Sequence, residues 1–159
     1  MPKISAPISL RAASLTLTGS LAAVVGTVSA DQANATTGAV ALGSASMVRL
    51  QGTYTRAGGS ATGRPIVAVD VSMDPPSTAP GSVGRFFPVY LLDGGSFALG
   101  VIDAYAEQVR PITPSAAGAT VFGTPPIDVR GAHWLRVRLA DVDGAAPGAV
   151  TLLVLGGEG

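Results

Sequence analysis

The chain has 159 residues, of which 47% are hydrophobic and 13% are charged, and its ten basic and ten acidic residues leave a formal net charge of zero. This composition excludes a disordered chain, and the length is sufficient for one domain with a substantial core. Nucleic-acid-binding proteins need a basic excess to face phosphates, so no nucleic-acid partner is expected. The absence of cysteine excludes a disulfide framework and a thiolate metal site.

The N-terminal segment 1–30 is similar to a secretory signal peptide, because Lys3 and Arg11 precede an apolar run that ends in Val-Ser-Ala. Secretion from a bacterium would follow only if this segment were a cleaved leader. Threonine, serine and glycine dilute the run, and it is too short and too polar to span a bilayer, so no membrane association is expected. We therefore predict an extended arm over residues 1–13 and a folded domain over residues 14–159.

Strand patterns dominate the rest of the chain. The segment 47–55 alternates between apolar and polar residues, and 65–73 places four apolar residues on one face. The segment 85–92 is apolar on both faces, which predicts a covered strand, and its Pro88 predicts an edge position or a bulge. Together with one or two strands in 14–28, the predicted strands are 47–55, 65–73, 85–92, 96–102, 133–142 and 149–155.

These short strands, separated by clusters of glycine and proline, predict an all-β fold. No window of eleven or more residues carries a helical stripe, and no repeat of fixed period occurs. We predict a single antiparallel β-sandwich of about eight strands, either jelly-roll-like or immunoglobulin-like. Long loops rich in proline and glycine are expected at 74–85 and 110–127.

The chain is poor in groups that catalyse reactions or bind metals. His133 is the only histidine, there is no Gly-x-Ser-x-Gly sequence, and the only glutamates are Glu107 and Glu158. The "DVDG" segment 141–144 resembles part of a calcium loop, but it lacks the third acidic position and the distal glutamate, so we interpret it as a turn. No nucleotide motif is present. We expect no enzyme activity, no catalytic residues, no cofactor and no metal.

Four segments in order suggest a family: "VRLQGTYT", "GRPIVAVDVSMD", "RFFPVYLLDGGSF" and "HWLRVRLADVDGAAPGAVTLLVL". Over residues 47–155 this order resembles the β-sandwich accessory proteins of tailed-bacteriophage virions. The segment 74–85 departs from the family pattern, because a proline-rich insertion replaces its short glycine turn. The resemblance implies an accessory virion component: a head decoration (cement) protein, a head fibre base or a tail-associated protein, with decoration of the capsid surface favoured. Its expected partners are the major capsid protein or other virion proteins.

Three stretches of the chain carry the expected interface: 134–138, 149–155 and the arm 1–13. In 134–138, Trp134, Arg136 and Arg138 share one face, and tryptophan and arginine are common interface anchors. The strand 149–155 is apolar on both faces, so it should be covered on both, by the arm or by another subunit. The predicted interface residues are Trp134, Arg136, Arg138, Leu153, Leu155, Ile4, Ile8 and Leu10.

The low charge also predicts assembly, because a lone soluble monomer benefits from net charge. A homo-oligomer is therefore expected, with a trimer as the favoured state. The alternative function is a tail- or fibre-associated module that recognises a host-surface glycan through Trp134 or the loop at 110–127.

Overall fold

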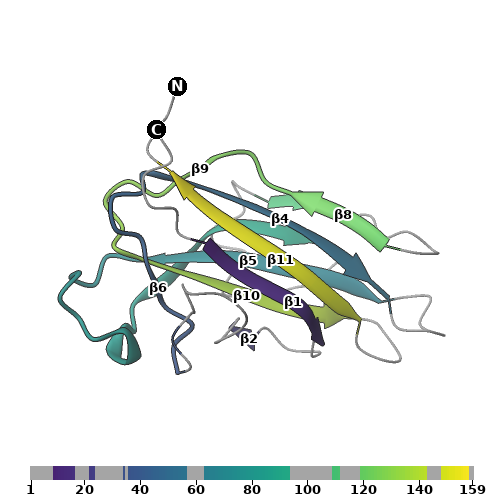
Figure 1. Ribbon diagram of the computed structural model, residues 1–159, viewed down its shortest axis with the longest axis horizontal. Helices are drawn as coiled ribbons and strands as arrows, with labels where there is room; N and C mark the ends of the chain where they lie inside the picture. Colours follow the sequence, from purple (N-terminus) through teal and green to yellow (C-terminus); the bar gives the residue numbers. More distant parts are fainter. Residues whose placement is uncertain are drawn as a thin grey trace.

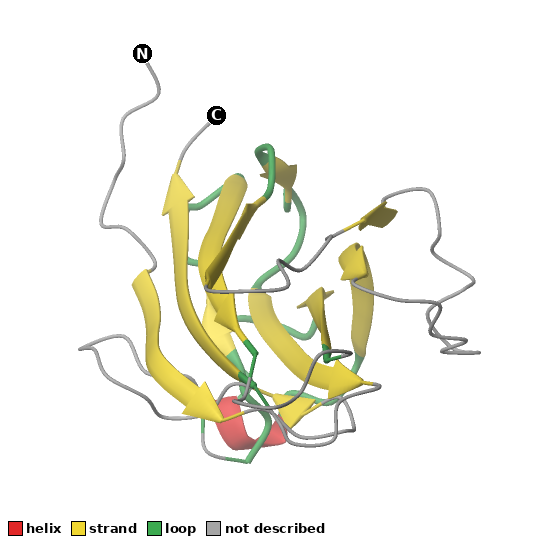
Figure 2. Cartoon of the chain, turned by 90° about the vertical axis from the view of Figure 1, so that its right-hand side faces the viewer, coloured by secondary structure: helices red, strands yellow, loops and turns green. Residues whose placement is uncertain are grey.

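The computed structural model shows two β-sheets packed face to face (Figures 1 and 2). Among the residues that the structure describes, the strand pairs are antiparallel except for β6 with β7, which are parallel. The predicted all-β sandwich is thereby confirmed. The structure describes residues 9–16, 22–23, 34, 36–56, 63–93, 109–111, 119–142 and 148–157.

The first sheet has the order β1–β11–β4–β8, with the short β9 also pairing with β4. Its strands are β1 (Ser9–Thr16), β11 (Ala149–Gly157), β4 (Met47–Thr55), β8 (Ala119–Gly123) and β9 (Ile127–Asp128). The second sheet has the order β2–β10–β5–β6–β7, with the short β3 also pairing with β10. Its strands are β2 (Ala22–Ala23), β10 (Trp134–Val142), β5 (Arg64–Ser72), β6 (Phe86–Asp93), β7 (Val109–Pro111) and β3 (Val40–Ala41).

The core lies between the sheets and follows from the alternation of each strand. In β10, Leu135, Val137 and Leu139 face inward and are at most 4% exposed. In β11, Val150 and Val154 face them from the opposite sheet and are fully buried. Burying each such side chain stabilises the fold by roughly 1.5–3 kcal/mol. Because the period of a strand is two residues, the remaining positions of β10 and β11 form the two outer faces of the sandwich.

Pro88 lies at a bulge in β6, as the sequence predicts. Val69 of β5 pairs with Tyr90, whereas the next residue, Asp70, pairs with Pro88, so Val89 is an extra residue without an opposite partner. A bulge tolerates proline because the regular ladder is already interrupted there.

The N-terminal boundary predicted at residue 13 is wrong. Residues 9–13 belong to β1, an edge strand that pairs with β11 of the same chain from Ser9 opposite Leu155 to Thr16 opposite Ala149. Backbone pairing therefore places this part of the expected arm beside β11 and not across its face. Residues 1–8 lie outside the described residues.

The predicted loop at 110–127 also needs correction, because β8 occupies Ala119–Gly123 in its middle and β9 begins at Ile127. The glycines and prolines on both sides of "ATVFG" are typical of a loop, and the strand between them has only five residues, so the sequence pattern does not indicate it. Its Phe122 is buried between the sheets. The strand predicted at 96–102 lies outside the described residues.

The 74–85 segment connects β5 to β6 as predicted, and it contains the short 3₁₀ turn η1 (Pro80–Ser82).

Candidate functional site

The outer face of the second sheet carries a charged cluster built around Asp70. Asp70 is fully buried, and its Oδ2 accepts hydrogen bonds from Arg136 Nε at 2.9 Å and Nη2 at 2.7 Å. Arg138 donates from Nε to Oδ2 at 2.6 Å and from Nη2 to Oδ1 at 3.0 Å. The cluster follows from register, because Asp70 stands opposite Arg136 in the β5–β10 ladder and the side chain of Arg138 emerges two residues along the same face.

Both arginines keep part of their side chains at the surface, with exposed fractions of 22% for Arg136 and 21% for Arg138. The Arg136 guanidinium carbon also lies 4.1 Å from the centre of the Phe86 ring. Charge-assisted hydrogen bonds and stacking on a ring restrict a side chain strongly, so the two cations are held in one arrangement. The contacts of this cluster join strands of one sheet. The ion pairs connect β10 to β5, and the contact between Arg136 and Phe86 connects β10 to β6.

Trp134 belongs to the same face but is buried, with 4% of its surface exposed. It packs with Ala39, Val83 and Phe86 in a small second core. Its Nε1 donates a hydrogen bond to the Pro75 carbonyl at 3.2 Å. The expected contact residue is therefore covered by the chain's own segments, which meet both the apolar body of the indole and its polar N–H.

Asp74 fastens the segment that covers Trp134. Its Oδ2 accepts from the amides of Gly84 at 2.9 Å and Arg85 at 3.3 Å, and its Oδ1 accepts from Arg85 Nε at 2.8 Å. These bonds join the two ends of the 74–85 segment. The amide of Gly84 first, and then that of Arg85, holds the pKa of Asp74 below its ordinary value of 3.8.

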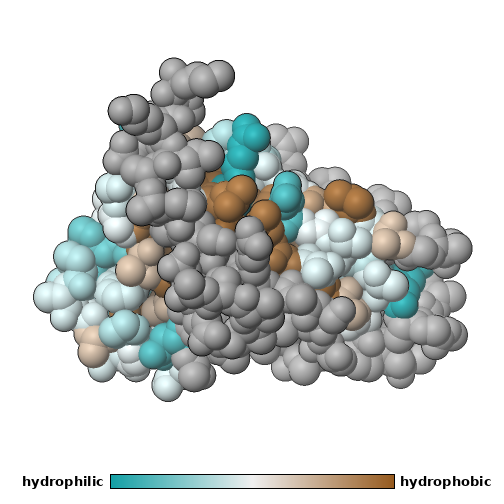
Figure 3. Space-filling view, in the orientation of Figure 1, coloured by the Kyte–Doolittle hydropathy of each residue, from teal (hydrophilic) through white to brown (hydrophobic). Residues whose placement is uncertain are grey.

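The outer face of the first sheet is more apolar. Leu153 is half-buried and Leu155 is 36% exposed on β11, and Val121 on β8 is 79% exposed. Between them β4 presents Gln51 and Thr53, which pair with Leu153 and Val121 respectively. Figure 3 shows apolar surface near the middle of the molecule on this side. The second apolar stripe predicted on β11 is thus present and partly open to solvent.

A buried polar contact closes one end of the sandwich. Tyr54 is 1% exposed, and its hydroxyl donates to Asp141 Oδ2 at 3.0 Å, which also accepts from the Gly148 amide at 2.5 Å. Burial, and then the hydrogen bond to Asp141, raises the pKa of Tyr54 above its ordinary value of 10. The interpretation of "DVDG" as a turn is wrong for Asp141 and Val142, which are paired residues of β10 opposite Pro65 and Arg64, in agreement with the strand predicted at 133–142. Residues 143–147 lie outside the described residues.

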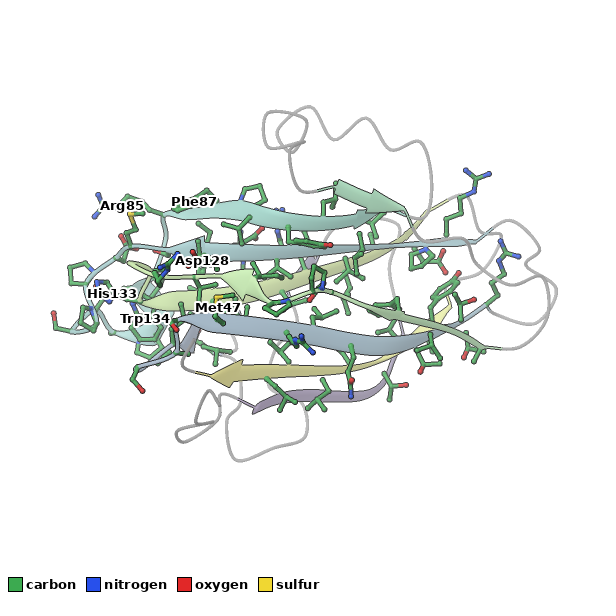
Figure 4. All side chains as sticks on the ribbon, turned by 90° about the horizontal axis from the view of Figure 1, so that it is seen from above. Met47, Arg85, Phe87, Asp128, His133 and Trp134 are labelled. Carbon is green, nitrogen blue, oxygen red and sulfur yellow. The ribbon has the colours of Figure 1, made fainter. Side chains whose placement is uncertain are left out.

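His133 lies immediately before β10, at the same end of the molecule as Trp134 and Arg85 (Figure 4). Its amide donates to the Ser72 carbonyl and its carbonyl accepts from the Leu42 amide, both at 2.9 Å. Asp128, near this end, forms an exposed ion pair with Arg130, which lowers the pKa of Asp128 to about 2. The backbone bonds of His133 tie it into the β10 ladder and give it a structural place.

The predicted interface residues do not form one surface. Trp134, Arg136 and Arg138 lie on the outer side of the second sheet, whereas Leu153 and Leu155 lie on the outer side of the first. Leu10 is in β1, where its backbone pairs with Val154. Ile4 and Ile8 lie outside the described residues. The sequence alternation identified the faces of β10 and β11, but it could not tell that β10 and β11 belong to different sheets.

The sequence analysis did not identify two hydrogen-bond partners: Asp70, which binds Arg136 and Arg138, and Tyr54, which binds Asp141. Asp70 is an acidic residue within an apolar strand, and its pairing with Arg136 becomes visible only once the β5–β10 register is known. Tyr54 and Asp141 are 87 positions apart, so their hydrogen bond leaves no local pattern in the sequence.

Among the described residues, no three or more histidine, cysteine, aspartate or glutamate side chains gather where a metal ion could bind. The described part of the chain also contains no helix long and apolar enough to cross a membrane.

No protein-family model, no curated protein and no solved structure matches this chain.

Proposed function

We propose that this chain is a non-enzymatic structural protein of a bacteriophage virion, a decoration (cement) protein that binds the major capsid protein on the head surface. The observation that carries the proposal is the partly exposed apolar stripe of Leu153 and Leu155 on the outer face of the first sheet. Exposed apolar residues that follow one another along a strand are typical of protein contact surfaces. A neutral chain adds no long-range repulsion when many copies assemble.

The N-terminal residues support the same surface. β1 begins at Ser9, directly opposite Leu155, so residues 1–8 are attached to the sandwich where the apolar stripe ends. That segment contains Ile4 and Ile8. Contacts between this segment and a neighbouring subunit would add contact area next to Leu155. Repeated over a symmetric lattice, such modest contacts stabilise the assembly through multivalency.

The alternative function, glycan recognition by a tail or fibre module, loses one of its two supports. A stacking platform for a sugar requires an exposed ring, whereas Trp134 is 4% exposed and lies under the 74–85 segment. The other support, the 110–127 segment, contains the edge strand β8. The partly exposed side chains of Leu153 and Leu155 offer apolar surface, which favours a protein partner over a sugar.

Binding of the purified chain to capsids that lack it tests the proposal. We expect Leu155→Lys to reduce co-sedimentation with capsids at least tenfold, because it places a charge within the apolar contact. Deletion of residues 2–8 should have a similar effect while leaving β1 intact. The matched control is Met73→Lys, since Met73 is 63% exposed but directly follows β5 of the other sheet. If Leu155→Lys and the deletion both bind like the unmodified chain, the proposed contact is wrong.

A further inference from the structure

The strand β8 forms one edge of the first sheet. It pairs with β4 on one side, and no described strand pairs with it on the other. Ala119, Val121 and Gly123 are all exposed, and Val121 has an exposed fraction of 79%. An exposed edge strand offers a row of backbone donors and acceptors to another strand.

The register identifies which backbone groups face the open edge. The Thr124 amide donates to the Leu50 carbonyl of β4 at 2.9 Å. Hydrogen bonding in an antiparallel pair alternates from one residue to the next, so the backbone groups of Phe122 and Thr120 also face β4. The N–H and C=O groups of Ala119, Val121 and Gly123 therefore point away from the sheet.

We propose that β8 of a second copy of this chain pairs with this edge, antiparallel and about a two-fold axis at Val121. In that register Val121 faces Val121 of the other copy, and Ala119 faces Gly123 on each side. All three are hydrogen-bonded pairs, which use every outward-facing backbone group of the strand. The two first sheets would then become one continuous sheet across the axis, which is the self-complementary contact of an isologous dimer.

The composition of the edge favours a second copy as the occupant. Residues 119–123 carry no charge, and neither do residues 51–55 of the adjacent β4, so two copies meet without like-charge repulsion. Strand edges that avoid self-pairing usually carry lysine, proline or an inward-pointing charge, and residues 119–123 contain none of these. Across the axis, alanine would face glycine, which leaves room for the backbones to approach. The two valine side chains would lie side by side on the outer face.

This inference stands apart from the proposed function, because it uses only β8 and its register. It also predicts a different oligomeric state from the one expected from the sequence. Pairing at a single edge produces a dimer of the 15.7 kDa chain and not the trimer favoured by the sequence. The mass of the species in solution distinguishes the two.

Sedimentation velocity over a range of concentrations tests the inference, with Val121→Pro as the first variant. Its N–H faces the open edge, so proline there leaves the β4–β8 hydrogen bonds intact and removes those at the axis. We expect a concentration-dependent dimer for the unmodified chain and an increase of about tenfold or more in its dissociation constant for the variant. Met73→Lys is the control and should dimerise normally. A chain that stays monomeric at every concentration, or a dimer that Val121→Pro does not weaken, overturns the inference.

A charge-pair experiment tests the position of the axis without relying on proline. Val121→Lys and Val121→Glu each place like charges opposite one another in the proposed pair, so each variant alone should dimerise poorly. An equal mixture of the two should recover a dimer, because the lysine and glutamate then face each other. Folding is checked by circular dichroism, and both variants change only a highly exposed side chain. If the mixture stays as monomeric as the separate variants, the two-fold axis at Val121 is wrong.

Discussion

Asp70 and Arg136 stand directly opposite each other on neighbouring strands of the second sheet, and the guanidinium of Arg136 contacts the fully buried Asp70 carboxylate at 2.7 Å. Arg138, two residues further along β10, donates hydrogen bonds to the same carboxylate. One buried anion thus holds two cations on the face to which Trp134 also belongs. The contact adds a buried ion-pair cluster to the backbone ladder that already joins β5 and β10.

Asp70→Ala should therefore destabilise the fold by about 3 kcal/mol, because it leaves two partly buried arginines without their counter-charge. The free energy of unfolding in urea measures this directly. Asp128→Ala is the matched control: it also removes an aspartate paired with arginine, but that pair is exposed and should change the unfolding midpoint little. Equal losses for the two variants would mean that the Asp70 cluster contributes no more than a surface ion pair.

Trp134 should report the state of the 74–85 segment as the pH falls. The pKa of Asp74 in the folded chain lies below 3.8, so its contribution to stability is present above that pH and is lost as the pH falls through the folded value. We expect the fluorescence of this sole tryptophan to be shielded from acrylamide at neutral pH and to become quenchable at pH values below about 3.8.

Asp74→Asn provides the control for this pH dependence. It keeps an oxygen that can accept a hydrogen bond but removes the titrating charge, so it should expose Trp134 more at neutral pH and flatten the acid transition. An acid transition of unchanged size and position in Asp74→Asn would assign the loosening to another group.

Tyr54 should remain protonated beyond the pH at which exposed tyrosines titrate. Its pKa is raised by burial and by Asp141, so the stability that its protonated hydroxyl contributes is complete below pH 10 and is lost as the pH rises above it. The difference in tyrosinate absorbance between the unmodified chain and Tyr54→Phe should appear only together with alkaline unfolding. A difference that titrates near pH 10 in the folded chain would contradict the buried contact with Asp141.

Gly52 should not tolerate even a methyl group. A Cβ atom there would lie 2.5 Å from Phe122 Cζ and 2.5 Å from the Thr151 carbonyl oxygen, so β4 could no longer approach β11 and the Phe122 ring. We expect Gly52→Ala to lower the free energy of unfolding by about 2 kcal/mol. Gly157→Ala, whose Cβ would meet no atom within 4 Å, should leave it unchanged.

The sequence pattern predicts the long strands well, because 47–55 alternates between apolar and polar residues and 149–155 is a long apolar run. The predicted 47–55 coincides with β4, and 149–155 lies within β11. β8 escapes prediction because five residues flanked by glycine and proline carry too little pattern to separate a strand from a loop. The arm boundary at residue 13 fails for a similar reason. The pattern of β1 is weak, and its place depends on pairing with β11, 140 or so positions away.

The candidate site is likewise predictable from the sequence only in part. Alternation groups Trp134 with Arg136 and Arg138, and Leu153 with Leu155, correctly along each strand. It does not contain the β5–β10 register that supplies Asp70, nor the path of the 74–85 segment that buries Trp134. Both depend on contacts between residues far apart in the chain, which a single sequence does not encode as a local pattern.

The location of the protein on purified phage particles tests the proposed function most directly. Cryo-electron microscopy of virions that contain this chain should show β-sandwich density repeated regularly over the head surface, with the outer face of the first sheet and the residues before Ser9 turned toward the capsid lattice. Particles without such density on the head, or with the chain confined to a few copies at the tail, would contradict the proposal.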